Sequence, residues 1–413
     1  MKIGIPKSFA GGVCGIFLIA AVFYNAGLAF INAHGFSIGQ GLVSVTEALI
    51  VLIAVAFIAF KIYAFPNLRP QLLFGAITIA MILFVALVNN FIYLKSIRDV
   101  LLIIVFFMIG GLSSEKGLIS VFKFVCAVIF LFMVIENYMT DFYVYLFEPS
   151  SYFANTRGIE EFSIDESGLF RNALGYAGRF SFNFLSDHRL SSLFLEQVSL
   201  ANFSMVLAIF TASFWSKLGK WARFSFVMLI ILIVLTNSTR TGTGVCLIIL
   251  AGFFIFPYLP RYSNLLYMPV ILIASVLLFY DPNYDLHGAD DNFAGRIGRT
   301  LFSLENLGMH YFTGGTMEMI QRTADSGYTY VILTQTLIGL LAFWLFTGLI
   351  VPQDNSANKR FAHSTSIYIF FNLMIGAAIF SIKVSAPLWF MAGYLYYQQY
   401  AKSPDGLLDR KHG

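Results

Sequence analysis

The sequence predicts an all-α polytopic integral membrane protein, and three observations support this fold class. Of the 413 residues, 58% are hydrophobic and 12% are charged, whereas soluble domains carry about 25% charged residues. Apolar runs follow one another along the chain, most of them separated by short polar breaks. Two breaks, 141–193 and 281–326, are much longer, and loops of this length are usually functional. The high hydrophobic and low charged percentages exclude a soluble enzyme and a disordered chain.

About twelve membrane-spanning helices are expected within a single membrane domain, residues 1–413. A straight span needs about 20 apolar residues, so the shorter runs leave this count open by one or two. The first run follows Lys2 and Lys7 and is long enough to span, which favours an uncleaved helix over a signal peptide. Short helices are expected in both large loops. The expected spans are 9–31, 43–65, 72–94, 99–113, 117–140, 194–215, 222–237, 242–259, 264–280, 327–351, 366–382 and 384–400.

Basic residues predict the orientation of these spans. With the N-terminus inside, most Lys residues collect on one side of the membrane, as cytoplasmic loops require. Both termini are then cytoplasmic, and 141–193 and 281–326 are the first and second large periplasmic loops of a bacterial inner-membrane protein. The inner set is Lys2, Lys7, Lys61, Arg69, Lys116, Lys217, Lys220, Arg223, Arg261, Lys359, Arg360, Lys402, Arg410 and Lys411.

Arginines on the outer side depart from this rule. The two large loops contain seven Arg and no Lys: Arg157, Arg171, Arg179, Arg189, Arg296, Arg299 and Arg322. The planar guanidinium binds phosphate or carboxylate with two parallel hydrogen bonds, which an ammonium cannot do. The arginines of the loops therefore indicate a binding site for a phosphate or carboxylate. The alternative is pairing with nearby acids: Glu160, Glu161, Asp165, Glu166, Asp290 and Asp291.

The short turn 236–242 contains a further outer arginine, Arg240. A charge flanked by apolar spans is energetically expensive and indicates a functional site, and the neighbouring hydroxyls of Ser238, Thr239 and Thr241 can donate to phosphate oxygens. The alternative is that Arg240 only extends to the membrane interface.

Two acids stand where a large loop enters a helix, Glu196 and Asp325. Each is a candidate general base, and Glu196 is alternatively a partner that orients Arg189. A helix-capping role is the simpler explanation for both. Gly314-Gly315 offers backbone N–H groups as an anion site, or is merely a turn.

Metal and cofactor sites are not expected. Cys14, Cys126 and Cys246 all lie inside apolar runs, where Cys acts as a small hydrophobe. The outer histidines lack metal-ligand spacing. The charge of +4 is too small to suggest nucleic acid as a partner. Glu47 and Glu136 lie near outer span ends and are expected to face the bundle interior, and most outer aromatics are expected to form loop core or interfacial belt.

Three stretches together resemble the bacterial polysaccharide polymerase (Wzy-type) and O-antigen ligase families, mainly over 179–245 and 295–345. Arg189-x-x-Ser192-x-Phe194-x-Glu196-Gln197 is similar to R-x-x-(S/G)-x-F-x-E-P, and Thr236-x-Ser238-Thr239-Arg240-Thr241-Gly242 to T-x-S-R-x-G. Gly314-Gly315, then Asp325-Ser326-Gly327-Tyr328 and Gly339, is similar to G-x-G…(H/D)-(N/S)-x-Y…G. Gln197 stands in place of Pro, and Thr239 is an insertion. Asp325 replaces the His typical of ligases, which favours a polymerase.

The resemblance implies a GT-C-like glycosyltransferase of O-antigen or exopolysaccharide synthesis. A glycan would pass from undecaprenyl pyrophosphate to a sugar hydroxyl of a second lipid-linked unit, without metal or cofactor. Pyrophosphate binding is assigned to Arg189 and Arg240, with Arg296 or Arg299 as third member and Arg179 as a further candidate. Glu196 is preferred over Asp325 as base. A chain-length regulator is a candidate partner beside the lipid bilayer.

Other functions stay open. An O-antigen ligase would transfer the glycan to the lipid A core. A lipid-linked oligosaccharide flippase or a transporter is the rival from another class. It would need ionisable groups along a central pathway, and charges in the middle of spans are nearly absent apart from Lys123. A peptidoglycan polymerase of the shape-and-division type is a second enzyme rival, but its motifs are not seen in this chain.

Overall fold

Helices make up all the regular structure in the described part of the chain. The computed structural model describes residues 7–158, 168–170, 173, 185–284, 292–323 and 326–402. Eight of the described helices are long and apolar enough to cross a membrane, which confirms the predicted class of a polytopic helical membrane protein. They are α1 (Lys7–His34), α2 (Gln40–Phe60), α3 (Arg69–Asn89), α5 (Glu115–Tyr138), α8 (Gln197–Phe214), α9 (Lys220–Asn237), α10 (Arg240–Ile255) and α15 (Gly327–Leu349).

Four further helices run alongside these eight: α4 (Leu94–Gly111), α11 (Tyr267–Phe279), α16 (Ser356–Leu373) and α17 (Ile382–Lys402). Each of the twelve predicted spans overlaps one of these twelve helices. The last four are shorter or more polar: α11 has 13 residues, and α4 carries Lys95, Arg98 and Asp99. The number of membrane crossings therefore stays a prediction. The α16 helix begins ten residues before the predicted 366, because Asn355 caps it through the N–H of Asn358.

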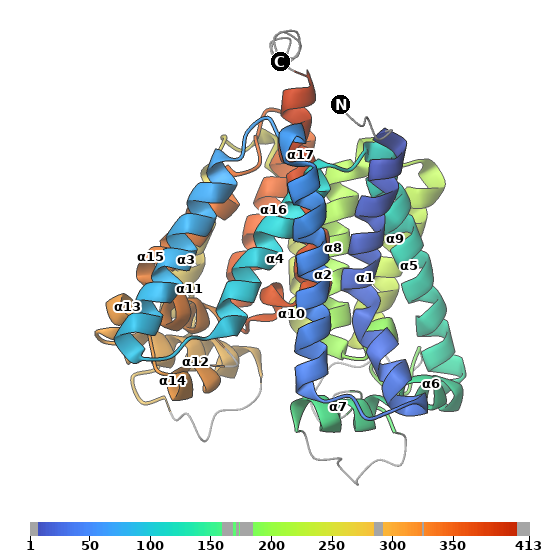
Figure 1. The fold of residues 1–413 in the computed structure, drawn as a ribbon, viewed down its shortest axis with the longest axis horizontal. Helices are drawn as coiled ribbons and strands as arrows, with labels where there is room; N and C mark the ends of the chain where they lie inside the picture. Colours follow the sequence, from blue (N-terminus) through green and yellow to red (C-terminus); the bar gives the residue numbers. More distant parts are fainter. Residues whose placement is uncertain are drawn as a thin grey trace.

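The two ends of the bundle differ in what they carry (Figure 1). The start of α1 and the end of α17 lie at one end, the terminal end. The short helices of the two large loops lie at the other, the loop end; they are α6 (Thr140–Phe147), α7 (Pro149–Arg157), α12 (Phe293–Glu305), α13 (His310–Thr313) and α14 (Met317–Gln321). Both predicted loops thus share the end opposite the termini, while the cytoplasmic position of the termini stays a prediction.

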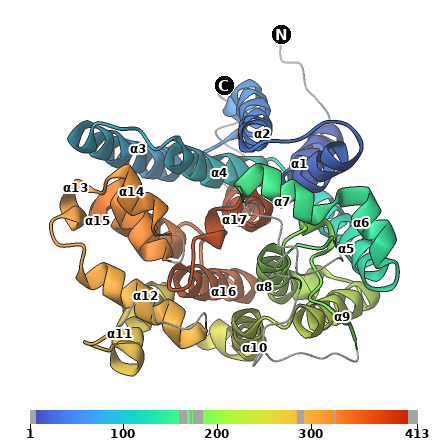
Figure 2. The same cartoon turned by 90° about the horizontal axis from the view of Figure 1, so that it is seen from below.

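The centre of the bundle is formed by α4, α8, α16 and α17, as the view along the helices shows (Figure 2). Glycine allows α4 and α17 to touch backbone to backbone. A Cβ on Gly110 would lie 1.9 Å from the carbonyl oxygen of Phe390, and one on Gly393 would lie 1.7 Å from that of Phe107. Small residues at such crossings are typical of membrane helix pairs. This close contact holds the middle of α17 against the last turn of α4.

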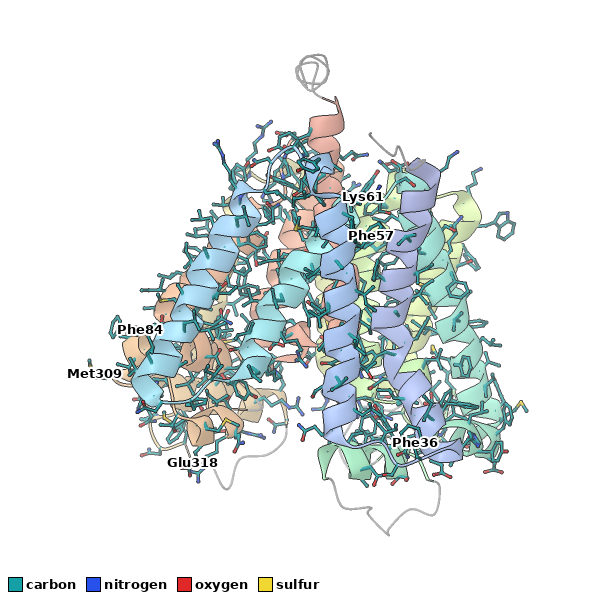
Figure 3. The ribbon with its side chains drawn as sticks, viewed as in Figure 1. Phe36, Phe57, Lys61, Phe84, Met309 and Glu318 are labelled. Carbon is teal, nitrogen blue, oxygen red and sulfur yellow. The ribbon has the colours of Figure 1, made fainter. Side chains whose placement is uncertain are left out.

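Apolar side chains cover the outside of the peripheral helices (Figure 3). Leu87 of α3 and Leu277 of α11 are 80% and 79% exposed, whereas nearly every residue of α8 is buried. Exposed aromatics lie near helix ends at the terminal end, among them Tyr63, Trp221 and Tyr258. Aromatic belts of this kind mark membrane interfaces, so the surface pattern agrees with a membrane-embedded protein.

Candidate functional site

A buried carboxylate, Glu136, shapes the segment that carries Arg189 and Glu196. It lies in the last turns of α5 and accepts hydrogen bonds from the N–H of Ser191 at 2.9 Å and from the Ser191 hydroxyl at 2.9 Å. Ser192 donates its hydroxyl to the carbonyl of Ile129 at 2.8 Å, and Ser192 and Leu195 both adopt positive φ. These bonds turn the chain sharply just before α8. Glu136 thus faces the bundle interior, as predicted, and acts as a positioning residue for the site.

We expect Glu136→Gln to lower the free energy of unfolding by about 1–2 kcal/mol. The amide can accept from Ser191, but its NH₂ group faces N–H donors that the carboxylate satisfied. Thermal unfolding of the purified protein in detergent measures this difference. Ser44→Ala at the exposed start of α2, whose hydroxyl donates to Gln40 within the same helix, is the control and should change little. An unchanged unfolding temperature for Glu136→Gln would show that the segment does not depend on this carboxylate.

Asn237 joins two motif stretches, 189–197 and 236–242, that are distant in sequence. Its Nδ2 donates to the carbonyls of Leu190 at 2.9 Å and Gln197 at 2.8 Å. In return, Nε of Arg189 donates to the Asn237 carbonyl at 2.7 Å, and Nη2 lies 3.3 Å from the Thr239 hydroxyl. The segment 189–197 and the turn 236–240 therefore form one hydrogen-bonded unit at the loop end.

Arg240 is the first residue of α10 and is exposed. The hydroxyl of Thr239, at the N-cap position, donates to Asn237 instead of capping α10. The first N–H groups of a helix have no partner within it and attract anions. Arg240 and the start of α10 are therefore suited to bind phosphate. Arg189, which is 7% exposed, orients this turn through the bonds described above.

Glu196 lies directly before α8 and binds two cations. Its Oε1 accepts from Nη1 of Arg157 at 2.8 Å, and its Oε2 lies 3.5 Å from Nζ of Lys383. Ser199 donates its hydroxyl to Oε2 at 2.8 Å. The structure thus pairs Glu196 with Arg157 and not with Arg189. We call Arg157, Glu196 and Lys383 the Glu196 triad.

The environment of Glu196 controls its basicity. Burial by itself raises the pKa of this carboxyl, but the charges of Arg157 and Lys383 and the hydrogen bonds from Arg157 and Ser199 hold the pKa well below its usual range. A carboxylate with so low a pKa accepts a proton poorly. Glu196 can act as a base only when these cations bind another group.

A second charged cluster joins α2, α4 and α15. Arg98 pairs with Glu47 of α2 and with its neighbour Asp99, which is fully buried. Asp99 also accepts from Lys95 at 3.0 Å and from the hydroxyl of Tyr330 at 2.7 Å. Glu47 faces the interior, as predicted. We call Glu47, Lys95, Arg98 and Asp99 the Arg98 cluster.

Cations at the two ends of the bundle have different partners. At the terminal end, Lys359 and Arg360 donate to carbonyls at 2.6 Å and 2.9 Å, and Arg261 pairs with Asp354 on the surface. At the loop end, the Arg98 cluster and the Glu196 triad contain four cations and three carboxylates. One positive charge is thus left uncompensated within these two groups, which favours an anionic ligand there.

The third motif stretch lies away from this unit. Gly314 donates its N–H to the carbonyl of His310 at 3.0 Å, and Gly315 donates to that of Leu333 at 2.9 Å. Leu333 is available because α15 is broken at Thr336, which adopts φ 61° and ψ 177°. A Cβ on Gly314 would also lie 2.4 Å from Val85. The two glycines therefore form a packed turn, which was one of the two predicted roles, and their N–H groups are already bonded.

The remaining candidates separate into two groups. Arg296 and Arg299 lie on α12, which packs against α11 and α15; both are partly buried. Arg179 and Asp325 lie outside the described residues. The described contacts thus bring Arg189, Arg240 and Glu196 into one unit, whereas Arg296 and Arg299 lie on a helix that packs against α11 and α15.

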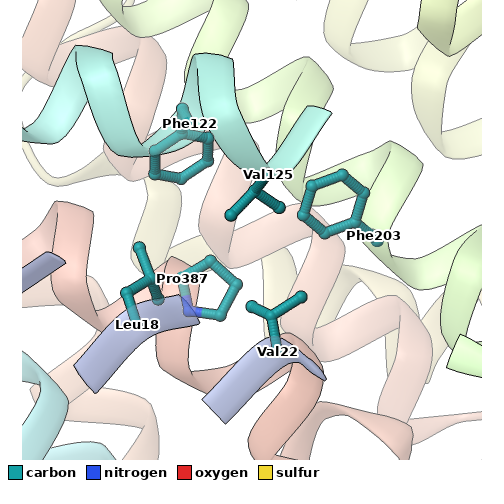
Figure 4. A pocket seen from close by; sticks show the side chains of 6 residues that line it. All are labelled: Leu18, Val22, Phe122, Val125, Phe203 and Pro387. Carbon is teal, nitrogen blue, oxygen red and sulfur yellow. The ribbon is translucent and has the colours of Figure 1, made fainter. Parts of the chain in front are cut away.

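Some of the described loop aromatics are core residues and others face outward. Tyr143, Tyr152, Phe153 and Phe170 are at most 5% exposed, whereas Tyr145 and Phe312 are 64% and 61% exposed. An apolar pocket lies between α1, α5, α8 and α17, lined by Leu18, Val22, Phe122, Val125, Phe203 and Pro387 (Figure 4). Side chains of this kind suit packing or a hydrocarbon tail and cannot bind a charged group.

Sequence reasoning missed three residues of this arrangement: Asn237, Arg157 and Lys383. Each acts on a residue far away in sequence, and single motifs carry no such information. Arg157 is one of the seven arginines of the large loops, but nothing in the sequence paired it or Lys383 with Glu196. Comparisons of the chain with protein-family models, curated proteins and solved structures find no match.

Proposed function

We propose that this protein polymerises lipid-linked oligosaccharide repeat units at the periplasmic face of a bacterial inner membrane. The growing glycan moves from undecaprenyl pyrophosphate to a sugar hydroxyl of another lipid-linked unit, as in GT-C-like glycosyltransferases. The observation that carries this proposal is the unit formed by Arg189 and Asn237. It brings the starts of α8 and α10 together, with Glu196 at one and Arg240 at the other.

Arginine supports the departure of the pyrophosphate. When the bond between sugar and pyrophosphate breaks, negative charge develops on the leaving oxygen. Preformed cationic and N–H donors stabilise such charge. In this proposal Arg240 and the first turn of α10 supply these donors, and Arg189 orients them. Arg179, Arg296 and Arg299 are further candidates for the same role.

A carboxylate accepts the proton of the attacking hydroxyl. Glu196 is preferred for this step, with Asp325 as the alternative. Apolar helices hold the polyprenyl tail, and a chain-length regulator remains a candidate partner. The proposed reaction needs no metal or cofactor, because the lipid pyrophosphate is itself the leaving group.

A transporter or flippase is favoured by one specific observation, the Arg98 cluster. Ionisable groups inside membrane helices often mark ion or substrate pathways, and Glu47, Arg98 and Asp99 lie within α2 and α4. An O-antigen ligase would share the donor with a polymerase and differ in its acceptor, the lipid A core. The products that accumulate distinguish these functions.

Complementation of a host that lacks its own polymerase tests the proposal. We expect Arg240→Ala and Glu196→Ala to abolish polymer while single repeat units are still exported and protein levels stay unchanged. Asp325→Ala tests the alternative base. Arg322→Ala is the matched control, because Arg322 pairs with Glu318 on the exposed surface of α14. Single units retained at the cytoplasmic face would favour the flippase, and polymer that is not attached to lipid A would favour the ligase.

A further inference from the structure

Lys383 is a buried ammonium whose hydrogen bonds are long. Its side chain is 3% exposed, and its partners among the described residues are Oε2 of Glu196 at 3.5 Å and the carbonyl of Phe194 at 3.4 Å. Hydrogen bonds from N–H to oxygen are normally 2.7–3.2 Å long, and an ammonium has three donors. A buried cation this loosely bonded has room for a better anionic partner.

Arg157 gives such a partner access from outside. Its side chain is 40% exposed and packs over the ring of Phe153, with the guanidinium carbon 4.6 Å from the ring centre. It comes from α7, whereas Lys383 comes from α17, so the two cations reach Glu196 from different elements. The carboxylate of Glu196 lies between them and is 16% exposed. An anion that enters beside Arg157 meets both cations.

We propose that Arg157 and Lys383 form an anion site for a phosphate of a polyprenyl pyrophosphate, and that Glu196 occupies this site until the ligand displaces it. The identity of the ligand rests on the proposed function; the anion site itself follows from the charges of the triad. Both cations would donate to the phosphate oxygens, and Ser199 would still hold Glu196 close by.

Displacement converts Glu196 from an ion-pair partner into a base. Without the two cations, and with a phosphate nearby, its pKa rises, since nearby negative charge disfavours the ionised form. Glu196 then takes the proton of the acceptor hydroxyl while the hydroxyl oxygen bonds to the anomeric carbon. The bond from that carbon to the pyrophosphate oxygen breaks, and its electron pair leaves with the pyrophosphate. The base becomes active only when the pyrophosphate is bound.

Binding of inorganic pyrophosphate to the full chain in detergent, measured by calorimetry, tests this competition. We expect Glu196→Gln to bind pyrophosphate about tenfold more tightly than the natural protein, because the competing carboxylate charge is gone. Glu115→Gln is the control. Glu115 pairs with Lys217 at the terminal end, so its replacement should leave the affinity unchanged. An unchanged or weaker affinity in Glu196→Gln overturns the proposal.

A second set of variants separates the cations from the carboxylate. Adding Lys383→Met to Glu196→Gln should remove the gain in pyrophosphate affinity. Adding Arg157→Gln to Glu196→Gln should remove it too. The Arg157 variant replaces the other if the change at buried Lys383 prevents folding, because the Arg157 side chain is partly exposed. Retention of the gain in both would overturn the proposal. Farnesyl pyrophosphate should bind more tightly than inorganic pyrophosphate; equal affinity would overturn the assignment to a lipid. These readouts are independent of polymer formation, so a failed anion site and a failed polymerase assignment give different results.

Discussion

Replacing Arg98 by Met is expected to lower the free energy of unfolding by about 3–5 kcal/mol. Arg98 supplies the cation that pairs Glu47 of α2 with Asp99 of α4. The side chain of Asp99 is fully buried and that of Glu47 is 9% exposed, so neither carboxylate can turn to water. Lys95 and Tyr330 still bind Asp99, but Glu47 keeps only the hydroxyl of Tyr24 among the described contacts. The large loss arises from this uncompensated charge.

Thermal unfolding in detergent measures the effect, and a double variant identifies its cause. Arg98→Met combined with Glu47→Gln should be more stable than Arg98→Met alone, because one unpaired charge is removed. Arg322→Met breaks an exposed pair with Glu318 and should change stability by less than about 1 kcal/mol. If Arg98→Met and Arg322→Met have equal effects, the Arg98 cluster does not hold α2 to α4.

Replacing Arg189 by Lys is expected to reduce polymer formation about a hundredfold, the scale of a misplaced catalytic group. The guanidinium binds the Asn237 carbonyl through Nε and reaches Thr239 and the Asn237 side chain through Nη2. An ammonium is a single point and cannot bind this set in the same geometry. The turn that carries Arg240 would then lose its orientation, so the charge at position 189 alone is not sufficient.

Arg223→Lys provides the matched control for Arg189→Lys. Arg223 also donates through Nε to a backbone carbonyl, that of Trp215 at 2.9 Å, but it lies at the terminal end. Its replacement should leave polymer formation unchanged. Asn237→Ala should reproduce the loss seen with Arg189→Lys, because it removes the other half of the same unit. Full activity of Arg189→Lys would contradict the role of the guanidinium shape.

The predictable part of the fold is the part determined by local hydropathy. All twelve predicted spans overlap helices, since each apolar run must form its own backbone hydrogen bonds in a membrane. The start of α16 was predicted too late because residues 356–363 are largely polar, yet half of them are buried in the structure. Similarly, the break of α15 at Thr336 could not be predicted from the sequence. It accompanies the hydrogen bond from Gly315 to Leu333, a tertiary interaction that local propensity does not describe.

The candidate site could be predicted as a set of residues but not as a set of partners. Charge placement and motif spacing identified Arg189, Glu196 and Arg240, and the fold brings them into one unit. The partner of Glu196 was not predictable: the cation nearest in the motif is Arg189, but Arg157 and Lys383 lie closer in space. The seven-residue spacing between Arg189 and Glu196 does not reveal where the two side chains point. The chain turns between them at Ser192 and Leu195, which both adopt positive φ.

The hydrogen bonds of Asn237 also constrain how this protein can evolve. One side-chain amide donates to two carbonyls of the segment 189–197 while the backbone of the same residue accepts from Arg189. An aspartate at 237 would face two carbonyls with no proton to donate, so this position tolerates few replacements. Positions 189, 237 and 239 are therefore expected to vary together among descendants of this chain, while the surrounding lipid-facing surface changes freely.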